Sequence, residues 1–489
     1  MAITAGATTR LGLGTLRQVP PAARPRIRPG TVGAGILHLG LGAFHRAHQA
    51  VYTEDAIAEA GGDWGIVGVA PRSPDLIGRL AAQDNLFSVT SLSGGSAVTR
   101  VVGSLAAVRH APSDPLAVVA LLADPAIRVV TLTVTEKAYR LDPATGRLRI
   151  DDEVLADLTG DRPPATVPGL LARGLIARSW ADAGPIALVS CDNLPDNGRR
   201  LHGMVSRALE LVGQGEDWMA RNVTFPGTTV DRIVPATTPE TLATARAALG
   251  VTDLAAVAAE PYLQWVIEDV FFGDRPAWER AGAVLTADVT PWERLKLRTL
   301  NGVHSALAYL GALAGCETIA DALALPGMES VMRRLLVEDI AASFTPPPGA
   351  DIVGYGESVL ERFRNPAIRH RTLQVAMDGT QKLPQRVLDT LRDRRAAGAE
   401  PRWAALVVAA WMRFAAGTAD DGRPLPLDDP LAGEVRALLA ADGSGPAVLF
   451  GLTQVFGSDL AHDEVVRRLV AGWLDALSRH GAAGTVAGA

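Results

Sequence analysis

Three polar side chains with chemical potential lie within one otherwise apolar stretch, Pro291–Gly311 (PWERLKLRTLNGVHSALAYLG). They are the amine of Lys296, the amide of Asn301 and the imidazole of His304. Burial among apolar neighbours lowers the pKa of a lysine, and enzymes use this effect to obtain a base that works near neutral pH. An amide and an imidazole beside such a base could hold and polarise a hydroxyl or carbonyl oxygen. These groups suit the interconversion of an alcohol and a ketone, which also needs a hydride carrier.

The apolar spacing of this stretch predicts a helix of about five turns. Pro291 suits its first turn, and Glu293 in the same turn is favourable for the helix dipole. At about 100° per residue, Asn301 lies about 140° from Lys296, and His304 falls between them. One broad face therefore presents all three groups. A purely structural alternative stays open, in which the lysine reaches solvent along its stem, the asparagine bonds to backbone and the histidine is a satisfied core residue.

Length, charge and cysteine content restrict the class of protein. A chain of 489 residues is too long for one core and predicts two or three domains. The net charge of −6 argues against nucleic acid or an anionic membrane as the main partner. Two cysteines without a CxxC spacing predict neither a disulfide framework nor a zinc site, and we expect no metal. We find no signal-peptide pattern and no apolar run long enough to span a bilayer, so we expect a cytoplasmic protein.

A dinucleotide-binding unit is predicted near the start of the chain. The apolar run Ala34–Leu39 is followed at once by GLGAFHRAHQ, which is the order strand, glycine turn and helix. Gly40 permits the tight turn, and Gly42 lets the backbone approach a pyrophosphate. His45 stands in place of the third glycine of GxGxxG, so the motif alone would fit a generic turn equally well. The cofactor-binding residues predicted in this turn are Gly40, Gly42, Ala43 and Phe44.

The end of a second predicted strand, Trp64–Ala70, bears on which cofactor is bound. An acidic residue at this place would hold the adenosine ribose of NAD. Arg72 and Ser73 occupy the position here, and Asp75 comes late. Arg72 could accept a 2′-phosphate, or could lie at the surface without a role in binding. We expect NAD as the cofactor, with NADP left open.

Two further buried strands are predicted at Arg128–Thr135 and Pro185–Ser190. Ligands of open α/β sheets bind beyond the carboxyl ends of the strands. Thr135 and Glu136, where the first of these strands ends, are therefore candidates for cofactor binding. Asn193 follows the second strand and is placed to meet a substrate, although an Asx turn or a helix cap would explain it too.

The pattern of the chain changes near residue 285. Before it, strands alternate with helices; from Pro291 onward helical periodicity dominates, interrupted by breakers such as Pro326 and Pro401. The predicted fold class is therefore α/β plus all-α. We place a Rossmann-type dinucleotide-binding domain at residues 1–285 and a helical domain at residues 286–489.

Seven stretches, in order between roughly residues 33 and 390, match one known family. They are GLGAFHRAHQ, VTLTVTEKAY, SCDNLPDNG, FPGTTVDRIVPAT, QWVIEDVFFGDRPAWE, PWERLKLRTLNGVHSALAYLG and AMDGTQKLPQR. The chain resembles the polyol-specific long-chain dehydrogenases, the mannitol dehydrogenase family, for which the K-x4-N-x2-H helix is highly specific. The resemblance implies a Rossmann-type domain, a helical domain and a metal-independent, nicotinamide-dependent oxidation of a secondary alcohol.

The resemblance also implies roles for individual residues. Lys296 would be the general base, taking the proton of the substrate hydroxyl while hydride leaves the same carbon for C4 of the nicotinamide. Asn193 and Asn301 would hold the developing alkoxide, and His304 would orient the reacting oxygen. The remaining implied roles are substrate contacts by Asp231 and Lys382 and a proton relay by Glu293.

The substrate class follows from finer similarity. The stretches FPGTTVDRIVPAT, VTPWERLKLRTLNG and RHRTLQVAMDGTQKLPQR look more like the mannonate oxidoreductase (fructuronate reductase) branch than the mannitol 2-dehydrogenase branch. A sugar acid needs a cation for its carboxylate, and Arg369, Arg371 and Lys382 are candidates. We expect D-mannonate and D-fructuronate, with mannitol, arabinitol, tagaturonate or other polyols as alternatives and a non-catalytic NAD sensor as a distant one. The relatives include monomers, so we expect a monomer or a weak oligomer.

Overall fold

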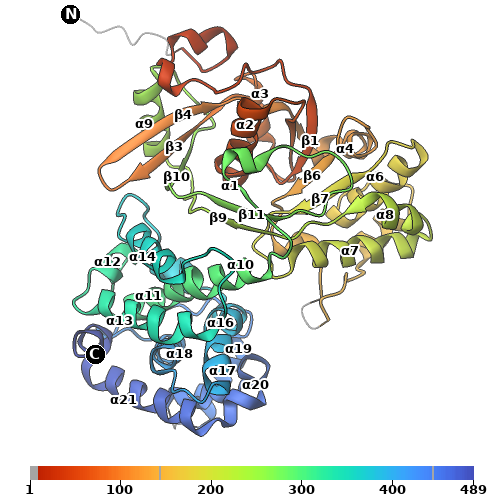
Figure 1. The fold of residues 1–489 in the computed structure, drawn as a ribbon. Helices are drawn as coiled ribbons and strands as arrows, with labels where there is room; N and C mark the ends of the chain where they lie inside the picture. Colours follow the sequence, from red (N-terminus) through yellow and green to blue (C-terminus); the bar gives the residue numbers. More distant parts are fainter. Residues whose placement is uncertain (1–8, 143–144, 443–444) are drawn as a thin grey trace, which may run out of the picture. The chain divides into compact units, whose positions relative to one another are not determined.

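The computed structural model describes residues 9–142, 145–442 and 445–489. The chain divides into two compact units, Met1–Thr290 and Pro291–Ala489, which we call the α/β unit and the helical unit (Figure 1). The boundary predicted from the sequence lies at residue 285, shortly before this division. Among the described residues, no helix combines the length and the apolar character that crossing a membrane requires.

The α/β unit is built on six parallel strands in the order β5-β2-β1-β6-β7-β8 (Figure 1). When the strands of this sheet are numbered in the order in which they follow one another along the chain, their arrangement is that of the doubly wound Rossmann fold. The direction in which strands are added reverses between β1 and β6. The predicted Rossmann-type fold is confirmed. The strands are β1 (Ala34–Leu39), β2 (Gly65–Ala70), β5 (Leu105–His110), β6 (Val129–Leu132), β7 (Ile186–Ser190) and β8 (Val223–Thr224).

Both faces of this sheet are covered by helices or other strands. Because successive side chains of a strand point to opposite sides, each strand contributes to the cores on both faces. Leu37 and Leu39 of β1 pack in a core with residues of α4, α6 and α7, whereas Ile36 packs in a second core with α2 and the buried Trp265. Coverage of both faces explains why these strands read as continuous apolar runs. The helices are α1 (Ala43–Ala47), α2 (Gln49–Ala60), α3 (Pro74–Ala81), α4 (Pro115–Leu122), α5 (Asp152–Thr159), α6 (Val167–Trp180), α7 (Asn197–Val212), α8 (Glu216–Asn222) and α9 (Pro239–Leu249).

Two three-stranded sheets complete the α/β unit, in the orders β10-β3-β4 and β12-β11-β9. The stretch from residue 222 to 235 contains β8 and β9. These strands are β3 (Phe87–Ser93), β4 (Ser96–Val102), β9 (Thr228–Asp231), β10 (Val257–Ala259), β11 (Gln264–Glu268) and β12 (Val284–Thr286). The 3₁₀ turns are η1 (Leu13–Gln18), η2 (Pro21–Ala23), η3 (Ala111–Ser113), η4 (Glu136–Tyr139) and η5 (Trp278–Ala281).

The helical unit is arranged around α11, whose residues are all buried. This helix packs against α12, α15 and α18, and α18 packs in turn against α21. The predicted helical character of this unit is confirmed. Its α-helices are α10 (Thr290–Leu295), α11 (Gly302–Leu313), α12 (Ile319–Leu323), α13 (Met328–Arg334), α14 (Ile352–Phe363), α15 (Thr372–Ala376), α16 (Gly379–Leu383), α17 (Asp389–Ala396), α18 (Arg402–Ala415), α19 (Ala432–Asp442), α20 (Thr453–His462) and α21 (Glu464–Ala487), and its 3₁₀ turns are η8 (Ala341–Ser343) and η10 (Pro446–Gly451).

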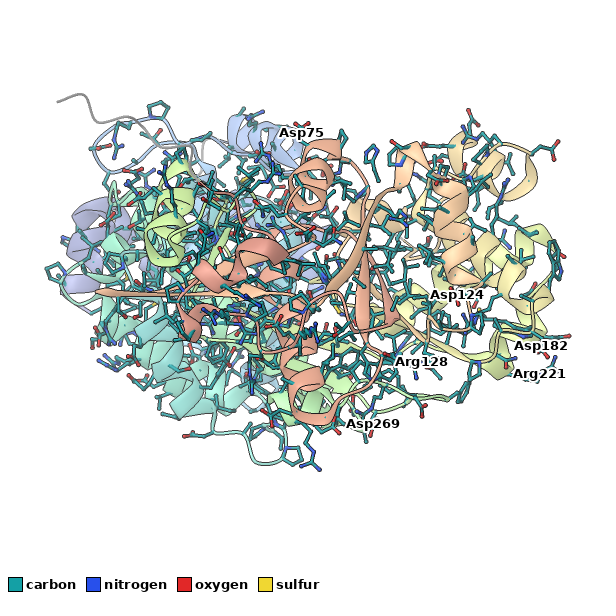
Figure 2. The ribbon with its side chains drawn as sticks, turned by 90° about the horizontal axis from the view of Figure 1, so that it is seen from above. Asp75, Asp124, Arg128, Asp182, Arg221 and Asp269 are labelled. Carbon is teal, nitrogen blue, oxygen red and sulfur yellow. The ribbon has the colours of Figure 1, made fainter. Side chains whose placement is uncertain are left out.

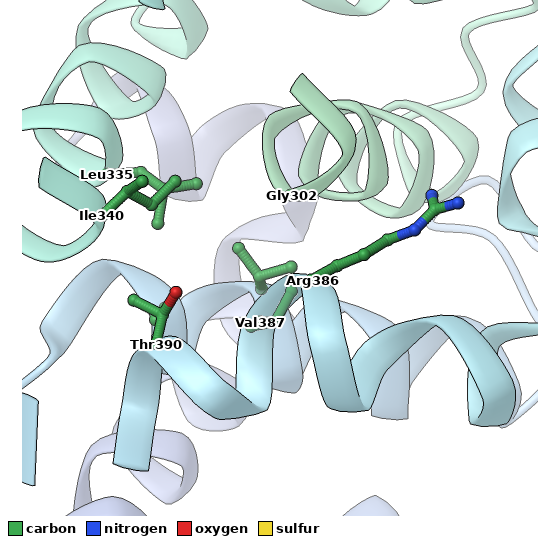
Figure 3. A pocket seen from close by; sticks show the side chains of 8 residues that line it. Gly302, Leu335, Ile340, Arg386, Val387 and Thr390 are labelled. Atoms are coloured by element: carbon green, nitrogen blue, oxygen red, sulfur yellow. The ribbon is translucent and has the colours of Figure 1, made fainter. Parts of the chain in front are cut away.

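Three segments of the helical unit are π-helical, η6 (Lys296–Asn301), η7 (Leu335–Ile340) and η9 (Pro384–Leu388). A π turn closes with i→i+5 hydrogen bonds, is rare and frequently marks a functional site. The stretch predicted as one helix is therefore helical throughout, but its middle turn is wider than an α-helical turn. η6 packs against both η7 and η9. Residues of η7 and η9, together with Gly302 just after η6, line a narrow pocket (Figure 3), whose lining is Gly302, Leu335, Ile340, Arg386, Val387, Thr390, Ala404 and Val407.

Candidate active site

The glycine turn after β1 is fixed by backbone contacts on both sides. The Gly40 and Leu41 amides donate to the Val69 carbonyl at the end of β2, at 2.9 and 3.0 Å. The Thr133 hydroxyl, just beyond β6, donates to the Gly40 carbonyl at 2.9 Å. Gly40 has a φ of +107°, and a Cβ there would lie 2.1 Å from the Thr133 carbonyl oxygen. Only glycine fits, so the turn is held at the point where the strand order reverses.

Gly42 has a different reason to be glycine. A Cβ at this position would have a single neighbour within 4 Å, the Gly40 carbonyl oxygen at 3.6 Å. The protein itself therefore does not require glycine here, and the space beside the backbone is open. Close approach of backbone to a pyrophosphate needs this arrangement. The adjoining Ala43 and Phe44 are half-buried, and the Phe44 ring stacks on His48 at 5.0 Å.

His45, in the place of the third glycine, belongs to a buried histidine pair. Its ring stacks on that of His38 in β1 with a centroid separation of 3.4 Å. The two ring nitrogens of His38 lie 2.8 Å from the Thr131 hydroxyl and 3.0 Å from the Thr133 hydroxyl. Burial lowers the pKa of His38 to about 3 and lowers the pKa of His45 well below its usual range. Both rings are therefore neutral near pH 7, and the stack packs the helix start against β1.

The end of β2 carries the residues that bear on the choice between NAD and NADP. Arg72 and Ser73 are exposed, and the Ser73 hydroxyl caps α3 by accepting the Leu76 amide at 3.5 Å. Asp75 is exposed in the first turn of α3 (Figure 2). No carboxylate therefore follows β2 directly, as the sequence indicated.

Asp192 joins the ends of β6 and β7. Its carboxylate accepts the Thr135 amide at 2.8 Å and the Tyr139 hydroxyl at 2.8 Å, and burial raises its pKa. Thr135 has a φ of +75°, which is uncommon for a residue other than glycine, and it is exposed like the adjoining Glu136. Asn193, next to Asp192 in the chain, is also exposed. We did not single out Asp192 from the sequence, although it precedes Asn193 in the SCDN stretch.

A second set of contacts carries Asp231 to the same edge of the sheet. The Asn197 amide group donates to the Asp192 carbonyl at 3.1 Å and to the Thr228 carbonyl at 2.9 Å. The Thr228 amide donates back to the Asn197 side-chain oxygen at 2.9 Å. Thr228 begins β9, and the buried Asp231 ends it. The strand with Asp231 is thus bonded to the segment with Asn193.

Lys296, Asn301 and His304 lie together in the helical unit. They are 8%, 7% and 9% exposed. Lys296 and Asn301 are the first and last residues of η6, and His304 lies in the first turn of α11. Because a π turn closes at i→i+5, Asn301 lies about one turn above Lys296, and the α-helical separation of about 140° does not apply. The π turn therefore brings the amine and the amide closer to one face than the sequence predicted.

Two buried side-chain nitrogen atoms of this face have no hydrogen-bond partner among the described residues. They are the amide nitrogen of Asn301 and the Nε2 atom of His304. A buried donor without a partner costs free energy, so such atoms need an explanation such as a ligand. The His304 ring stacks on Phe363 at 4.7 Å and meets the edge of His370 at 4.5 Å. Its orientation is thereby fixed.

Arg298 anchors the π turn from its other side. Its guanidinium lies 2.6 Å from the Asp393 carboxylate, donates to the Ser343 hydroxyl at 2.8 Å and lies over the Phe344 ring at 5.4 Å. A buried arginine with several partners fixes backbone position strongly. The sequence analysis did not single out this residue, because an arginine in an amphipathic helix reads as a surface residue. Glu293, one turn before Lys296 in α10, is half-buried.

The three cations predicted for a sugar acid differ in environment. The Lys382 side chain is 25% exposed, and its Nζ donates to the Met377 carbonyl at 2.5 Å. The side chains of Arg369 and Arg371 are 74% and 66% exposed and lie 3.9 and 3.7 Å from the Glu317 carboxylate. The two arginines therefore face solvent, whereas Lys382 is partly enclosed.

Lysine is rare in this chain, and its distribution is informative. The only lysines are Lys137, Lys296 and Lys382, among 47 lysines and arginines. An arginine does not lose its proton in a protein, so of these two residue types only lysine can act as a proton acceptor. Two of the three lysines are predicted site residues.

Among the described residues, no three histidine, cysteine, aspartate or glutamate side chains gather to hold a metal ion.

Comparisons with known proteins cover almost the whole chain. The models of the mannitol dehydrogenase Rossmann domain and C-terminal domain match residues 34–280 and 288–477. A D-mannonate oxidoreductase of Escherichia coli (strain K12) is 40% identical over 452 residues, which cover 90% of this chain and 92% of the relative. A mannitol 2-dehydrogenase of Cereibacter sphaeroides is 37% identical over 465 residues, with coverage of 94% and 97%. The solved ternary complex of Pseudomonas fluorescens mannitol 2-dehydrogenase with NAD and D-mannitol is 34% identical, with a TM-score of 0.85 and coverage of 98% of both chains.

Alanine at the two glycines of the turn should have opposite consequences. Gly40→Ala forces a Cβ against the Thr133 carbonyl at a strained φ, so we expect the free energy of unfolding to fall by at least about 2 kcal/mol. Gly42→Ala should leave stability unchanged and weaken NADH binding by about tenfold or more, because the methyl group fills the space left for the ligand. Urea unfolding and titration of NADH fluorescence measure the two effects. Unchanged NADH affinity in a folded Gly42→Ala protein would contradict this assignment.

Replacing His38 should reduce the sensitivity of the fold to acid. Since the folded pKa of His38 is about 3 and an unfolded histidine titrates near 6.5, the unfolded chain binds a proton in this window that the folded chain does not. Stability is therefore lost as the pH falls from about 6.5. We expect the free energy of unfolding of the wild type to fall more steeply than that of His38→Asn, by up to about 1.4 kcal/mol per pH unit. Urea unfolding across this pH range tests this, with the exposed His462→Asn as control; equal slopes for the wild type and His38→Asn would refute it.

Proposed function

We propose that this chain, which belongs to the mannitol dehydrogenase family and is an oxidoreductase of polyols or sugar acids, interconverts D-mannonate and D-fructuronate with NAD and without a metal. The observation that carries the chemistry is the buried lysine of η6 beside two buried donors, on Asn301 and His304, that lack partners among the described residues. A base and two oxygen-directed donors are what the oxidation of an alcohol requires of a protein without a metal.

In the proposed oxidation, Lys296 accepts the proton of the substrate hydroxyl. The amide of Asn301 and the Nε2 atom of His304 donate to the same oxygen as its negative charge develops, and Asn193 is a further donor to it. Bound NAD supplies the hydride acceptor for the carbon that carries this oxygen. Glu293, one turn before the base, passes the proton on to solvent. In the reductive direction Lys296 returns the proton to the carbonyl oxygen.

The proposed cofactor is NAD. The switch point of the sheet and the open space at Gly42 fit a dinucleotide, and the Pseudomonas fluorescens relative was solved with NAD. NADP stays an alternative, because Arg72 rather than a carboxylate follows β2. The residues proposed to hold the cofactor are Gly40, Gly42, Ala43, Phe44, Arg72, Thr135 and Glu136.

The proposed substrate is a sugar acid. Support comes from the 40% identity with a D-mannonate oxidoreductase and from the cations of the helical unit. Asp231, Lys382 and Arg371 are the proposed contacts with the part of the substrate that does not react. We further propose a cytoplasmic enzyme that works as a monomer or a weak oligomer and engages neither nucleic acid nor a membrane, in keeping with its net charge of −6.

Substitutions on η6 should separate chemistry from cofactor binding. We expect Lys296→Ala to lower kcat by about 10² to 10⁴, the contribution of a general base, and Asn301→Ala to lower it by about 10² to 10³, the contribution of one oxyanion donor. The affinity for NADH alone should stay as in the wild type. Stopped-flow turnover and NADH fluorescence titration give the two readouts, with the exposed Arg294→Ala in α10 as control. A Lys296→Ala enzyme with wild-type kcat would remove the lysine from the mechanism.

The substrate is tested by following NADH consumption with D-fructuronate and D-fructose in parallel, with NADPH as the cofactor control. We expect a much higher kcat/KM for D-fructuronate, because only this substrate offers a carboxylate to the cations. A preference for D-fructose would instead identify a mannitol 2-dehydrogenase. NADH that binds without being consumed by any ketose would leave only a nucleotide-binding sensor.

A further inference from the structure

Two arginines that the sequence analysis did not select lie near His304. Arg362 is 9% exposed and is the neighbour in α14 of Phe363, whose ring stacks on His304. The edge of His370 meets the same imidazole. The positive charge of Arg362 also acts on the His304 imidazole, since it lowers the pKa of that ring.

Arg386 approaches from another element. It lies in η9, and its Nη1 donates to the hydroxyl of Ser305, the residue after His304, at 3.2 Å. The η9 backbone is close to the junction of η6 and α11, since a Cβ on Gly302 would lie 2.8 Å from the Arg386 carbonyl oxygen. Figure 3 shows the Arg386 side chain extending away from the pocket beside Leu335 and Thr390. Its guanidinium is therefore directed away from that pocket and bonds to Ser305.

Three cationic side chains lie close enough to His304 to affect its pKa. Burial lowers the pKa of His304 well below its usual range, and His370, Arg386, Arg362 and Lys382 lower it further. Burial and the charge of Lys382 also lower the pKa of His370. The strongest charged neighbours of this imidazole are thus all positive, and they come from α14, η9 and α16. A region of this sign favours an anionic ligand over a neutral one.

Arg371, a cation predicted from the sequence to bind the carboxylate, would bind it more weakly than an enclosed arginine. The Arg371 side chain is 66% exposed and its guanidinium lies 3.7 Å from the Glu317 carboxylate. The more exposed Arg369 lies 3.9 Å from the same carboxylate. Ion pairs of exposed side chains contribute little, because water and salt screen them. A carboxylate held by enclosed guanidinium groups gains stronger, charge-assisted hydrogen bonds.

We propose that Arg362 and Arg386 form the subsite that recognises the carboxylate of the sugar-acid substrate and thereby select sugar acids over neutral polyols. This inference rests on the proposed function. His304 orients the reacting oxygen, and the two guanidinium groups that flank it from separate elements receive the charged end of the same molecule. A neutral polyol places a hydroxyl there, which accepts hydrogen bonds from the guanidinium groups but lacks the attraction between opposite charges.

The test uses Arg362→Gln, Arg386→Gln and Arg386→Lys in the full-length protein. Arg364→Gln is the matched control, because Arg364 also lies at the end of α14 but pairs at the surface with Glu329. We expect each Gln variant to lower kcat/KM for D-fructuronate by on the order of 10- to 100-fold, the loss of one charged hydrogen bond, and to leave D-fructose reduction nearly unchanged. Arg386→Lys should recover part of the loss, since it keeps the charge but not the planar fork.

A second readout avoids turnover. Calorimetric titration of the enzyme–NADH complex with D-mannonate and with D-mannitol gives the two dissociation constants. The Gln variants should weaken D-mannonate binding alone. Thermal unfolding checks that each variant is folded; if Arg362→Gln is not, the half-buried Arg386 carries the test by itself.

The outcomes separate this inference from the proposed function. If the wild type reduces D-fructose faster than D-fructuronate, the proposed substrate is refuted. The subsite still stands in that case if the wild type binds D-mannonate more tightly than D-mannitol and Arg386→Gln abolishes this difference. A wild type that prefers D-fructuronate while both Gln variants keep that preference overturns the subsite alone. Loss of the preference in Arg371→Gln, with Arg362→Gln and Arg386→Gln unaffected, assigns the carboxylate to the exposed arginine and overturns it too.

Discussion

The i→i+5 turn of η6 is the constraint on which the chemistry of the helical unit depends. An α-helix would turn Lys296 and Asn301 well apart, whereas the wider π turn places one about a turn above the other. A π turn is unfavourable in isolation and persists where packing holds it. Arg298 supplies part of that packing through Asp393 and Ser343. The proposed base, Lys296, and the Asn301 amide are thus aligned by contacts made on the opposite side of the helix.

In the α/β unit too, residues of the predicted site are held in place by other polar side chains, which are buried. Asp192 fixes the segment that carries Thr135, and Asn197 connects Asp192 to the strand that ends at Asp231. The neutral His38 and His45 rings pack the glycine turn in the same way. Apolar side chains could fill these volumes, but they could not fix backbone atoms in one place by directed hydrogen bonds. The cost of burying Asp192 and Asn197 is offset by these hydrogen bonds.

Charge is also distributed unequally. The chain is acidic as a whole, yet the strongest charged neighbours of His304 are cations. The two kinds of cation serve different purposes: a lysine can act as a base, and an arginine keeps its charge and offers a planar fork of donors. The chain has only three lysines, and two of them stand at positions 296 and 382. At position 296 the proposed role as a base requires lysine, because an arginine would keep its proton.

The sequence by itself determined the Rossmann-type and helical halves, the strands around the glycine turn and the family, because apolar periodicity and glycine spacing are local properties of the chain. It also identified the helix with Lys296, Asn301 and His304. Tertiary structure decided the π turn, since local periodicity near 3.6 cannot reveal an extra residue that is held by distant partners. It likewise brought Arg362 and Arg386 to His304 while leaving Arg369 and Arg371 at the surface. Residue type reveals that a cation is present, but burial and neighbours far along the chain decide which cation a ligand can reach.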